Sequence, residues 1–181
     1  MTTLTPLFPR QPVPSLDVPL VGGGRWSMAA RSPRTFTMVV FYRGLHCPIC
    51  SRYLGDLNGR TGALAERGVE VVAISSDEAD RAERAKASWK LDALDVGYGL
   101  GLDDARRWGL YLSTGRGPTS AGIEEPARFS EPGLFLVRPD GTLYFGTGQT
   151  MPFARPAFAE IVQALDFVIA KDYPARGEVL D

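Results

Sequence analysis

Residues 36–50 read FTMVVFYRGLHCPIC, a strand pattern that runs directly into two cysteines separated by two residues. The first seven of them are rich in β-branched and aromatic side chains without alternation, which is typical of a strand buried on both faces. The Arg-Gly pair at 43–44 ends this strand, and Pro48 suits the first turn of a helix, where its missing N–H costs nothing. We therefore expect Cys47 and Cys50 at the junction between a buried strand and the start of a helix.

The chain then continues as alternating helices and strands. A leucine stripe at helical spacing predicts a helix after the cysteine pair, and Gly68 is placed to end it. Residues 69–75, VEVVAIS, read as a second buried strand. Ser75 and Glu78 have the spacing of a capping box at the start of a helix over about 77–90. The next expected elements are a short strand near 96–100 and a short helix at about 103–110.

Three features mark the C-terminal half of the chain. Residues 112–131 are rich in Gly, Pro, Ser and Thr and predict a long loop. Residues 133–137 and 142–145 flank an Arg-Pro-Asp-Gly turn and predict a β-hairpin. Apolar residues recur at helical spacing from Phe158 to Ile169 and predict a final helix. This element order predicts an α/β fold in which a central mixed β-sheet is flanked by helices on both faces.

Length and charge narrow the classes of protein. The 181 residues fit one domain, and we assign 1–181 to it, with an irregular Pro-rich segment at 1–17 and a loose tail at 174–181. The net charge is −1, with basic residues scattered among acidic ones. Neither nucleic acid nor an anionic membrane is therefore an expected partner.

The lack of a recognisable targeting signal and the small number of cysteines both bear on the expected compartment. The chain has no apolar run long enough for a membrane span, and residues 1–20 do not read as a signal peptide. We therefore expect a cytoplasmic protein. Cys47 and Cys50 are its only cysteines, and the loop between them is too small for their disulfide to stabilise the fold much. The pair is not expected to be a structural disulfide.

The predicted position of the pair suits redox chemistry. Cys47 would face the first free N–H groups of a helix, whose positive dipole end favours a thiolate. Cys50, one turn later, would be more buried and would act as the resolving thiol. His46, the only histidine, is a candidate for adding positive charge or a hydrogen bond beside the thiolate, or else a solvent-facing loop residue. Arg43 is a further candidate for adding charge, with an ordinary surface arginine as the alternative.

Two other readings of the cysteine pair stay open. In the first, the two thiols are simply buried and unreactive, because free cysteine is often a core residue. They would also form half of a zinc site, which needs four ligands and would therefore require a symmetric dimer. A Cys-x-x-Cys next to a strand–helix–strand pattern in a cytosolic chain favours the redox interpretation over both.

The sequence also resembles a known group of proteins. Residues 41–50 (FYRGLHCPIC) and 133–141 (GLFLVRPDG) resemble the peroxiredoxin-like branch of the thioredoxin superfamily, the AhpC/TSA or redoxin proteins. The stretches 151–156 (MPFARP) and 171–177 (KDYPARG) are similar to members of the same branch. The resemblance covers about residues 15–170 and implies a thioredoxin-like fold. It further implies a redox-active disulfide, no bound cofactor or metal, and an external thiol donor.

The departures from the family pattern bear on mechanism. Peroxiredoxins carry a Pro-x-x-x-Thr-x-x-Cys loop after the first buried strand, and its Pro, Thr and Cys fall on Arg43, Cys47 and Cys50 here. The family's arginine before the hairpin strand falls on or beside Pro132. The match to thioredoxin-like proteins is better at this point, because those proteins place a cis-proline there. The resemblance therefore implies a cis Glu131–Pro132 bond.

These observations lead to one expected function and two alternatives. We expect a thiol–disulfide oxidoreductase or thiol-dependent antioxidant protein that uses the Cys47–Cys50 dithiol. The alternatives are a peroxiredoxin-type hydroperoxide reductase and a non-catalytic redox sensor or binding domain. The implied partners are a thiol reductant such as thioredoxin or glutathione, and a disulfide or hydroperoxide substrate. A homodimer is an open possibility.

Overall fold

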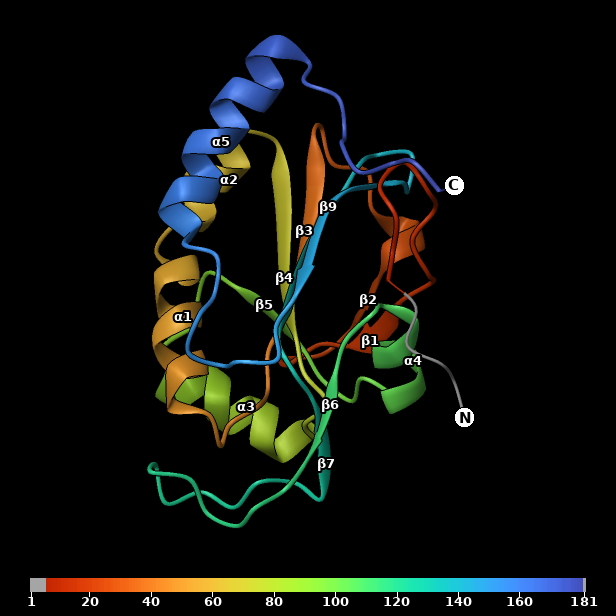
Figure 1. The fold of residues 1–181 in the computed structure, drawn as a ribbon. Helices are drawn as coiled ribbons and strands as arrows, with labels where there is room; N and C mark the ends of the chain where they lie inside the picture. Colours follow the sequence, from red (N-terminus) through yellow and green to blue (C-terminus); the bar gives the residue numbers. More distant parts are fainter. Residues whose placement is uncertain (1–5, 181) are drawn as a thin grey trace.

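The computed structural model describes residues 6–180, which fold around a five-stranded mixed sheet (Figure 1). Its strand order is β5-β4-β3-β8-β9. β3 lies at the centre, parallel to β4 and antiparallel to β8, and all six of its residues are buried. The strands are β3 (Phe36–Phe41), β4 (Val69–Ile74), β5 (Asp95–Gly97), β8 (Gly133–Val137) and β9 (Leu143–Gly148). The predicted buried strand before the dithiol and the predicted hairpin are both confirmed.

Two hydrophobic clusters pack against the two faces of this sheet. Met38 and Val40 of β3 face one cluster, while Val39 and Phe41 face the other. The first face is covered by α1 (Pro48–Asn58), α2 (Thr61–Glu66), α3 (Ala79–Ser88) and α5 (Phe158–Lys171). The opposite face is covered by β1 (Asp17–Pro19), β2 (Arg25–Ser27), the short helix η1 (Met28–Ala30) and α4 (Leu102–Arg107) (Figure 1). The predicted mixed sheet with helices on both faces is confirmed.

Local details of two helices differ from the sequence prediction. The helix expected up to Gly68 is broken into α1 and α2 at Gly59 and Arg60, since glycine is a poor helix former. The capping box of Ser75 and Glu78 is absent. Glu78 is itself the N-cap of α3 and makes no side-chain cap bond, while the Ser75 hydroxyl accepts a bond from the Asp77 N–H.

The segment predicted as a long loop at 112–131 is an extended hairpin. β6 (Leu112–Thr114) pairs antiparallel with β7 (Arg128–Ser130), and an isolated bridge joins Pro118 to Glu124 nearer the tip. We call residues 112–130 the arm. Figure 1 shows it leaving the sheet and passing beneath the ends of α1 and α3. Its Gly and Pro content concealed the strand pairing, because strands are normally poor in both residues.

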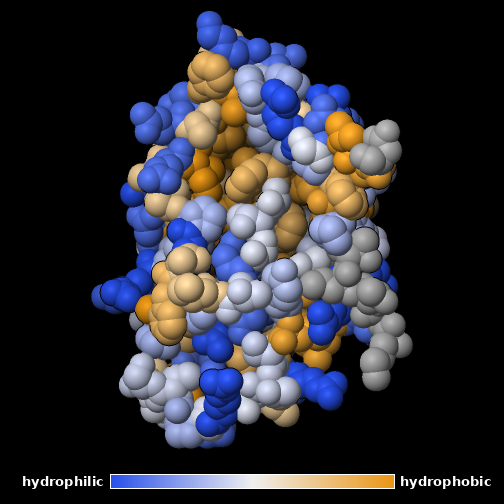
Figure 2. Space-filling view, in the orientation of Figure 1, coloured by the Kyte–Doolittle hydropathy of each residue, from blue (hydrophilic) through white to orange (hydrophobic). Residues whose placement is uncertain are grey.

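The final helix keeps part of its apolar face exposed. Phe158 and Leu165 are buried, but Phe167 is 56% and Ile169 is 40% exposed. A groove of about 600 Å³ runs between α5 and β9, and Figure 2 shows apolar atoms gathered beside α5. Within residues 6–180, no helix is long and apolar enough to cross a membrane.

The segments at the two ends of the described part, 6–16 and 174–180, contact each other. Residues 6–16 have little regular structure, and residues 1–5 of the predicted irregular segment lie outside the described part. Residues 174–180 contain no helix or strand, but they are docked on the molecule. Arg10 donates a hydrogen bond of 3.0 Å to the Ala175 carbonyl and forms an ion pair with Glu178, and Ala175 is buried.

Candidate active site

Cys47 is the N-cap residue of α1. Its backbone is extended, with φ −99° and ψ 105°, and Pro48 follows in the first helical turn as the sequence predicts. The backbone N–H of Cys50 donates a hydrogen bond of 3.4 Å to the Cys47 sulfur. The same N–H also donates to the Cys47 carbonyl at 3.0 Å, and the helix dipole adds to the stabilisation of negative charge at this position. The sulfur of Cys47 is therefore placed where a thiolate is favoured.

The environment separates the two thiols in acidity. Hydrogen bonding from Cys50 and the nearby charges of Arg155 and Arg43 lower the pKa of Cys47 to about 5, against the opposing effect of burial. Burial raises the pKa of Cys50 well above its ordinary value, and the neighbouring Cys47 adds to this. At neutral pH the pair therefore holds one proton, which stays on Cys50. The two cysteines are free rather than joined in a disulfide.

Arg155 is the strongest positive group at the two sulfurs. Its Nη2 lies 3.3 Å from the Cys50 Sγ and 3.7 Å from the Cys47 Sγ. The guanidinium is held by a bond from Nε to the Pro152 carbonyl and lies 5.1 Å from the centre of the Tyr53 ring. In the sequence, Arg155 stands out only as part of the stretch MPFARP, which assigns it no role. Nothing in the spacing from Cys50 indicates this contact, because 105 residues separate the two.

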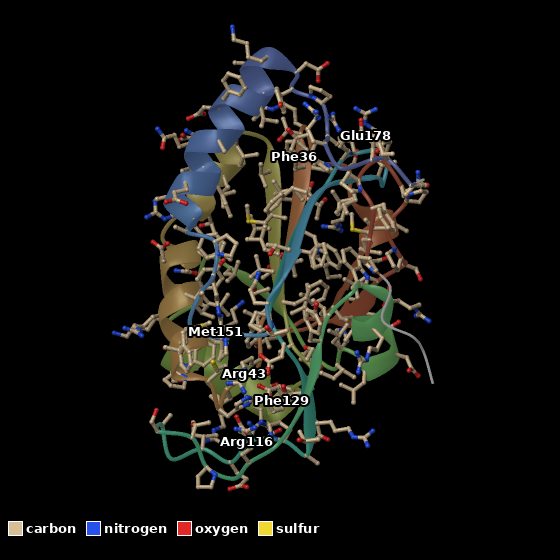
Figure 3. All side chains as sticks on the ribbon, in the orientation of Figure 1. Phe36, Arg43, Arg116, Phe129, Met151 and Glu178 are labelled. Carbon is tan, nitrogen blue, oxygen red and sulfur yellow. The ribbon has the colours of Figure 1, made fainter. Side chains whose placement is uncertain are left out.

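Arg43 lies at the end of β3 and points into the base of the arm. Its guanidinium forms ion pairs with Glu125 at 3.1 Å and Glu131 at 3.2 Å, and it stacks 4.7 Å from the centre of the Phe129 ring. Figure 3 labels Arg43 and Phe129 next to each other at this end of the sheet. Arg43 is half-buried, so the interpretation as an ordinary surface arginine is wrong. Its positive charge contributes to lowering the pKa of Cys47 from a distance, and its ion pairs attach the arm to the end of β3.

His46 is fully buried and uncharged at neutral pH. Desolvation, together with the positive charges of Arg43 and Arg81, lowers its pKa to about 3. Its Nδ1 lies 3.4 Å from Arg81 Nη2, and because arginine only donates, Nδ1 must accept and Nε2 must carry the proton. The ring packs 4.7 Å from Phe129. The predictions that His46 adds positive charge, or faces solvent, are therefore corrected.

The turn that carries the dithiol is fixed by a buried carboxylate. Asp77 accepts a hydrogen bond of 2.6 Å from the Leu45 N–H and one of 2.9 Å from Arg81. Gly44 has φ +133°, and a Cβ placed on it would lie 2.7 Å from the Asp77 carboxylate oxygens. Only glycine suits both the backbone angle and the space. The start of α3 thus sets the path of the chain into Cys47.

The arm closes over the same turn. The hydroxyl of Thr119, near the arm tip, donates a hydrogen bond of 2.6 Å to the His46 carbonyl. Arg81 donates to the Glu124 carbonyl at 3.1 Å. With the Arg43–Glu125 ion pair, these contacts attach the outer part of the arm to the turn before Cys47 and to α3. The predicted long loop is therefore part of the site's scaffold.

The predicted cis bond before Pro132 is wrong. No cis peptide bond occurs within residues 6–180, so the Glu131–Pro132 bond is trans. Hydrogen bonds on both sides hold the backbone here, from the Glu131 N–H to Tyr111 and from the Gln149 N–H to the Pro132 carbonyl. The Glu131 side chain accepts a bond of 2.6 Å from Ser113 and faces Arg43. Pro132 is buried, and its carbonyl is bonded by Gln149, the first residue of the segment that leads to Arg155.

Both sulfurs are covered in this state. Cys47 is 1% exposed and Cys50 is fully buried. The segment 149–157 joins β9 to α5 and lies against the first turns of α1, and Figure 3 labels Met151 near Arg43 in the view. Beside it lies a groove of about 320 Å³ lined by Ile49, Arg52, Tyr53 and Arg155 among others. Within the described part of the chain, no group of three or more His, Cys, Asp and Glu side chains is placed to hold a metal ion.

Comparisons with known proteins agree with this architecture. A peroxidoxin, BcpB, from Mycobacterium tuberculosis aligns with 90% of this chain and 98% of its own, at 16% identity and a TM-score of 0.69. AhpC from Enterococcus faecalis aligns with 93% of this chain and 98% of its own, at 18% identity and a TM-score of 0.70. A cysteine mutant of peroxiredoxin 6 from Arenicola marina aligns with 92% of this chain and 75% of its own, at 15% identity and a TM-score of 0.74.

At these identities the structural neighbours establish the fold, and the predicted thioredoxin-like α/β fold is confirmed. A search of curated protein sequences gives no match. The sequence model of the AhpC/TSA family matches residues 9–145, which is most of the chain. This protein therefore belongs to the AhpC/TSA family, and Cys47 and Cys50 form the Cys-x-x-Cys pair of a peroxiredoxin-like member.

Proposed function

We propose that this protein is a thiol–disulfide oxidoreductase in which Cys47 is the attacking thiolate and Cys50 the resolving thiol. The observation that carries the proposal is the asymmetry of the pair. The Cys47 sulfur accepts the Cys50 N–H at a helix N-terminus, and its pKa falls to about 5, whereas the pKa of Cys50 is raised. A thiolate that is formed at neutral pH beside a protonated partner is what exchange requires.

The reaction conserves atoms and charge in two steps. The Cys47 thiolate attacks one sulfur of a substrate disulfide, forming a mixed disulfide and releasing one substrate thiolate. Cys50 then loses its proton and attacks the Cys47 sulfur, which forms the Cys47–Cys50 disulfide and releases the second substrate thiol. The mixed disulfide is expected to be resolved promptly, because Cys50 lies one helical turn from Cys47 and attacks within the same molecule. An external thiol reductant, in a reducing compartment such as the cytoplasm, would return the pair to the dithiol.

A second candidate is hydroperoxide reduction, favoured by Arg155 and by the burial of Cys47. A small hydroperoxide needs less space than a protein disulfide to reach a sulfur that is 1% exposed, and the Arg155 guanidinium lies against both sulfurs. The thiolate would attack the terminal peroxide oxygen, forming a sulfenic acid as the O–O bond breaks and an alkoxide leaves. Cys50 would then attack the Cys47 sulfur and expel water as the disulfide forms.

The two candidates share one assignment that differs from family spacing. Alignment on the peroxiredoxin loop puts the peroxide-reacting cysteine at Cys50. The charges and hydrogen bonds support Cys47 instead, because Cys50 is fully buried and protonated. We therefore propose Cys47 as the first nucleophile for either substrate, with His46, Arg43, Pro48 and Pro132 as residues that position it.

Single cysteine variants separate the candidates. Cys47→Ser should abolish reduction of insulin disulfides, and Cys50→Ser should accumulate a mixed disulfide with the substrate, detected by intact mass. A peroxidase instead predicts that Cys50→Ser consumes one equivalent of hydroperoxide in a single turnover with little disulfide exchange. If Cys47→Ser kept both disulfide exchange and hydroperoxide reduction, the proposal would be refuted. If the wild-type protein had neither activity, a redox sensor or binding domain would remain.

A further inference from the structure

The groove beside the dithiol has the size of a small-molecule site. It lies between the first turns of α1 and the segment 149–157, and its volume is about 320 Å³. This is at the lower end of the range for ligand pockets. Its walls include Ile49, Arg52, Tyr53, Phe153, Arg155 and Pro156. One of these, Arg155, also contacts both sulfurs, so this side chain lies between the groove and the two thiols.

The charges in the groove favour an anion. Arg52 and Arg155 contribute two guanidinium groups to its lining, and Asp56 contributes the only carboxylate there. That carboxylate already pairs with Arg60 at 2.9 Å. The groove therefore carries an excess of positive charge next to a sulfur that reacts as an anion.

One nitrogen of Arg155 has no partner. Nη2 contacts the sulfurs and Nε donates to the Pro152 carbonyl, but Nη1 is buried without any hydrogen bond. A buried donor without an acceptor costs free energy, and guanidinium groups pair best with carboxylates. A ligand oxygen in the groove would satisfy this N–H once the Arg155 side chain turns towards it.

We propose that this groove binds low-molecular-weight disulfides that carry carboxylates, of the acidic thiol-peptide class, and delivers their sulfur to Cys47. The inference rests on the proposed exchange function and names its substrate class. The carboxylate pairs with Arg155 Nη1 and Arg52, while the ligand's apolar part lies against Ile49 and Phe153. The Cys47 thiolate then forms an S–S bond with the near sulfur, and the far half of the ligand leaves as a thiolate.

The narrow access to Cys47 explains the preference for a small substrate. Cys47 is 1% exposed, so any disulfide needs covering side chains to move, and a bulky protein disulfide needs a wider opening than a small one. Phe153, which lines the groove, is 74% exposed, so its side chain faces solvent. Arg155 contacts both sulfurs, so its displacement is part of the access of a compact ligand to Cys47.

The test measures the first step alone, in a Cys50→Ser background that traps the mixed disulfide. Three probes are compared by intact mass: anionic glutathione disulfide, neutral hydroxyethyl disulfide and cationic cystamine. Each rate is divided by the rate of the same probe with dithiothreitol, which removes differences in intrinsic reactivity. We expect the normalised rate for glutathione disulfide to exceed that for cystamine by roughly tenfold, and the ratio to shrink as salt is added.

Charge reversal at the groove gives the matched comparison. Arg52→Glu should lower the anion-to-cation ratio by about fivefold. Arg84→Glu makes the same charge change on the exposed side of α3, away from the groove, and should leave the ratio unchanged. Equal normalised rates for the three probes, or equal effects of the two variants, would overturn the inference while leaving exchange intact. No reaction with any probe would instead refute the proposed exchange function itself.

Discussion

Arg155 and Cys50 are in contact although 105 residues separate them, with Nη2 lying 3.3 Å from the sulfur. The same nitrogen lies 3.7 Å from the Cys47 sulfur, so one guanidinium serves both thiols. Because only Cys47 also receives a helix N–H, the negative charge settles there, and the proton settles on Cys50. The contact thus links the segment 149–157 to the ionisation of the dithiol.

Removing the charge of Arg155 should raise the pKa of Cys47. Arg155→Gln is expected to raise it by about one unit, because a cation within a few ångströms stabilises the thiolate. The measurement is the pH dependence of Cys47 alkylation by iodoacetamide. Arg155→Lys should recover part of the shift, whereas Arg84→Gln on α3 should have no effect. An unchanged alkylation profile in Arg155→Gln would show that the guanidinium is electrostatically irrelevant.

The sequence was sufficient to predict the fold and the dithiol, because both follow from local patterns. The apolar run at 36–42 and the proline after Cys47 define a strand followed by a helix without reference to the rest of the chain. The role of Arg155 was not predictable, because its contact depends on how the segment after β9 returns to α1. A single arginine in a loop gives no periodic signal.

Two further errors have the same origin in long-range contacts. The arm reads as a loop because its composition is that of a loop, yet pairing of β6 with β7 and ion pairs to Arg43 order it. His46 reads as a charged neighbour of Cys47, but packing on Phe129 and the field of two arginines keep it neutral. In each case the deciding partner lies tens of residues away.

Gly44 should be intolerant of a side chain. Gly44→Ala is expected to destabilise the protein by about 2–4 kcal/mol, because φ is +133° and the added Cβ would meet the Asp77 carboxylate. Chemical unfolding in urea measures the change. Gly55→Ala is the control, since Gly55 lies within α1 with nothing within 4 Å of an added Cβ, and it should stabilise by about 0.5–1 kcal/mol. Equal effects of the two substitutions would contradict the close approach of Asp77.

His46 should make the protein less stable in acid. Its pKa is about 3 when folded and near the ordinary 6.5 when unfolded, so between these values the unfolded chain binds the extra proton. Its stabilising contribution is therefore complete above about pH 6.5 and is lost as the pH falls towards 3. We expect a loss of about 2 kcal/mol from this residue between pH 7 and 4.5.

His46→Asn tests this contribution because it keeps a polar group that can accept from Arg81. Urea unfolding at pH 7 and 4.5 should show a smaller acid-induced loss in the variant, by about the same 2 kcal/mol. His46 is the only histidine, so no other imidazole contributes to the difference. An identical loss in both proteins would mean that His46 is charged in the folded state.

The arm tip should depend on one hydrogen bond to the turn before Cys47. Thr119→Val keeps the shape of the side chain but removes the hydroxyl that donates to the His46 carbonyl at 2.6 Å. Hydrogen exchange should become faster in residues 116–125, with a global stability loss of only about 1 kcal/mol. Ser120→Ala, at the exposed neighbouring position, should leave exchange in the arm unchanged. Unchanged exchange in Thr119→Val would contradict this attachment.

Titration of the Cys47 thiol tests most directly whether Cys47 is the nucleophile. Thiolate absorbance at 240 nm should be followed from pH 3 to 10 in the wild-type protein and in the two single Cys→Ser variants. One thiol should titrate near pH 5, and this transition should vanish in Cys47→Ser and remain in Cys50→Ser. Absence of any transition below about pH 8, or its survival in Cys47→Ser, would contradict the assignment of Cys47 as the nucleophile.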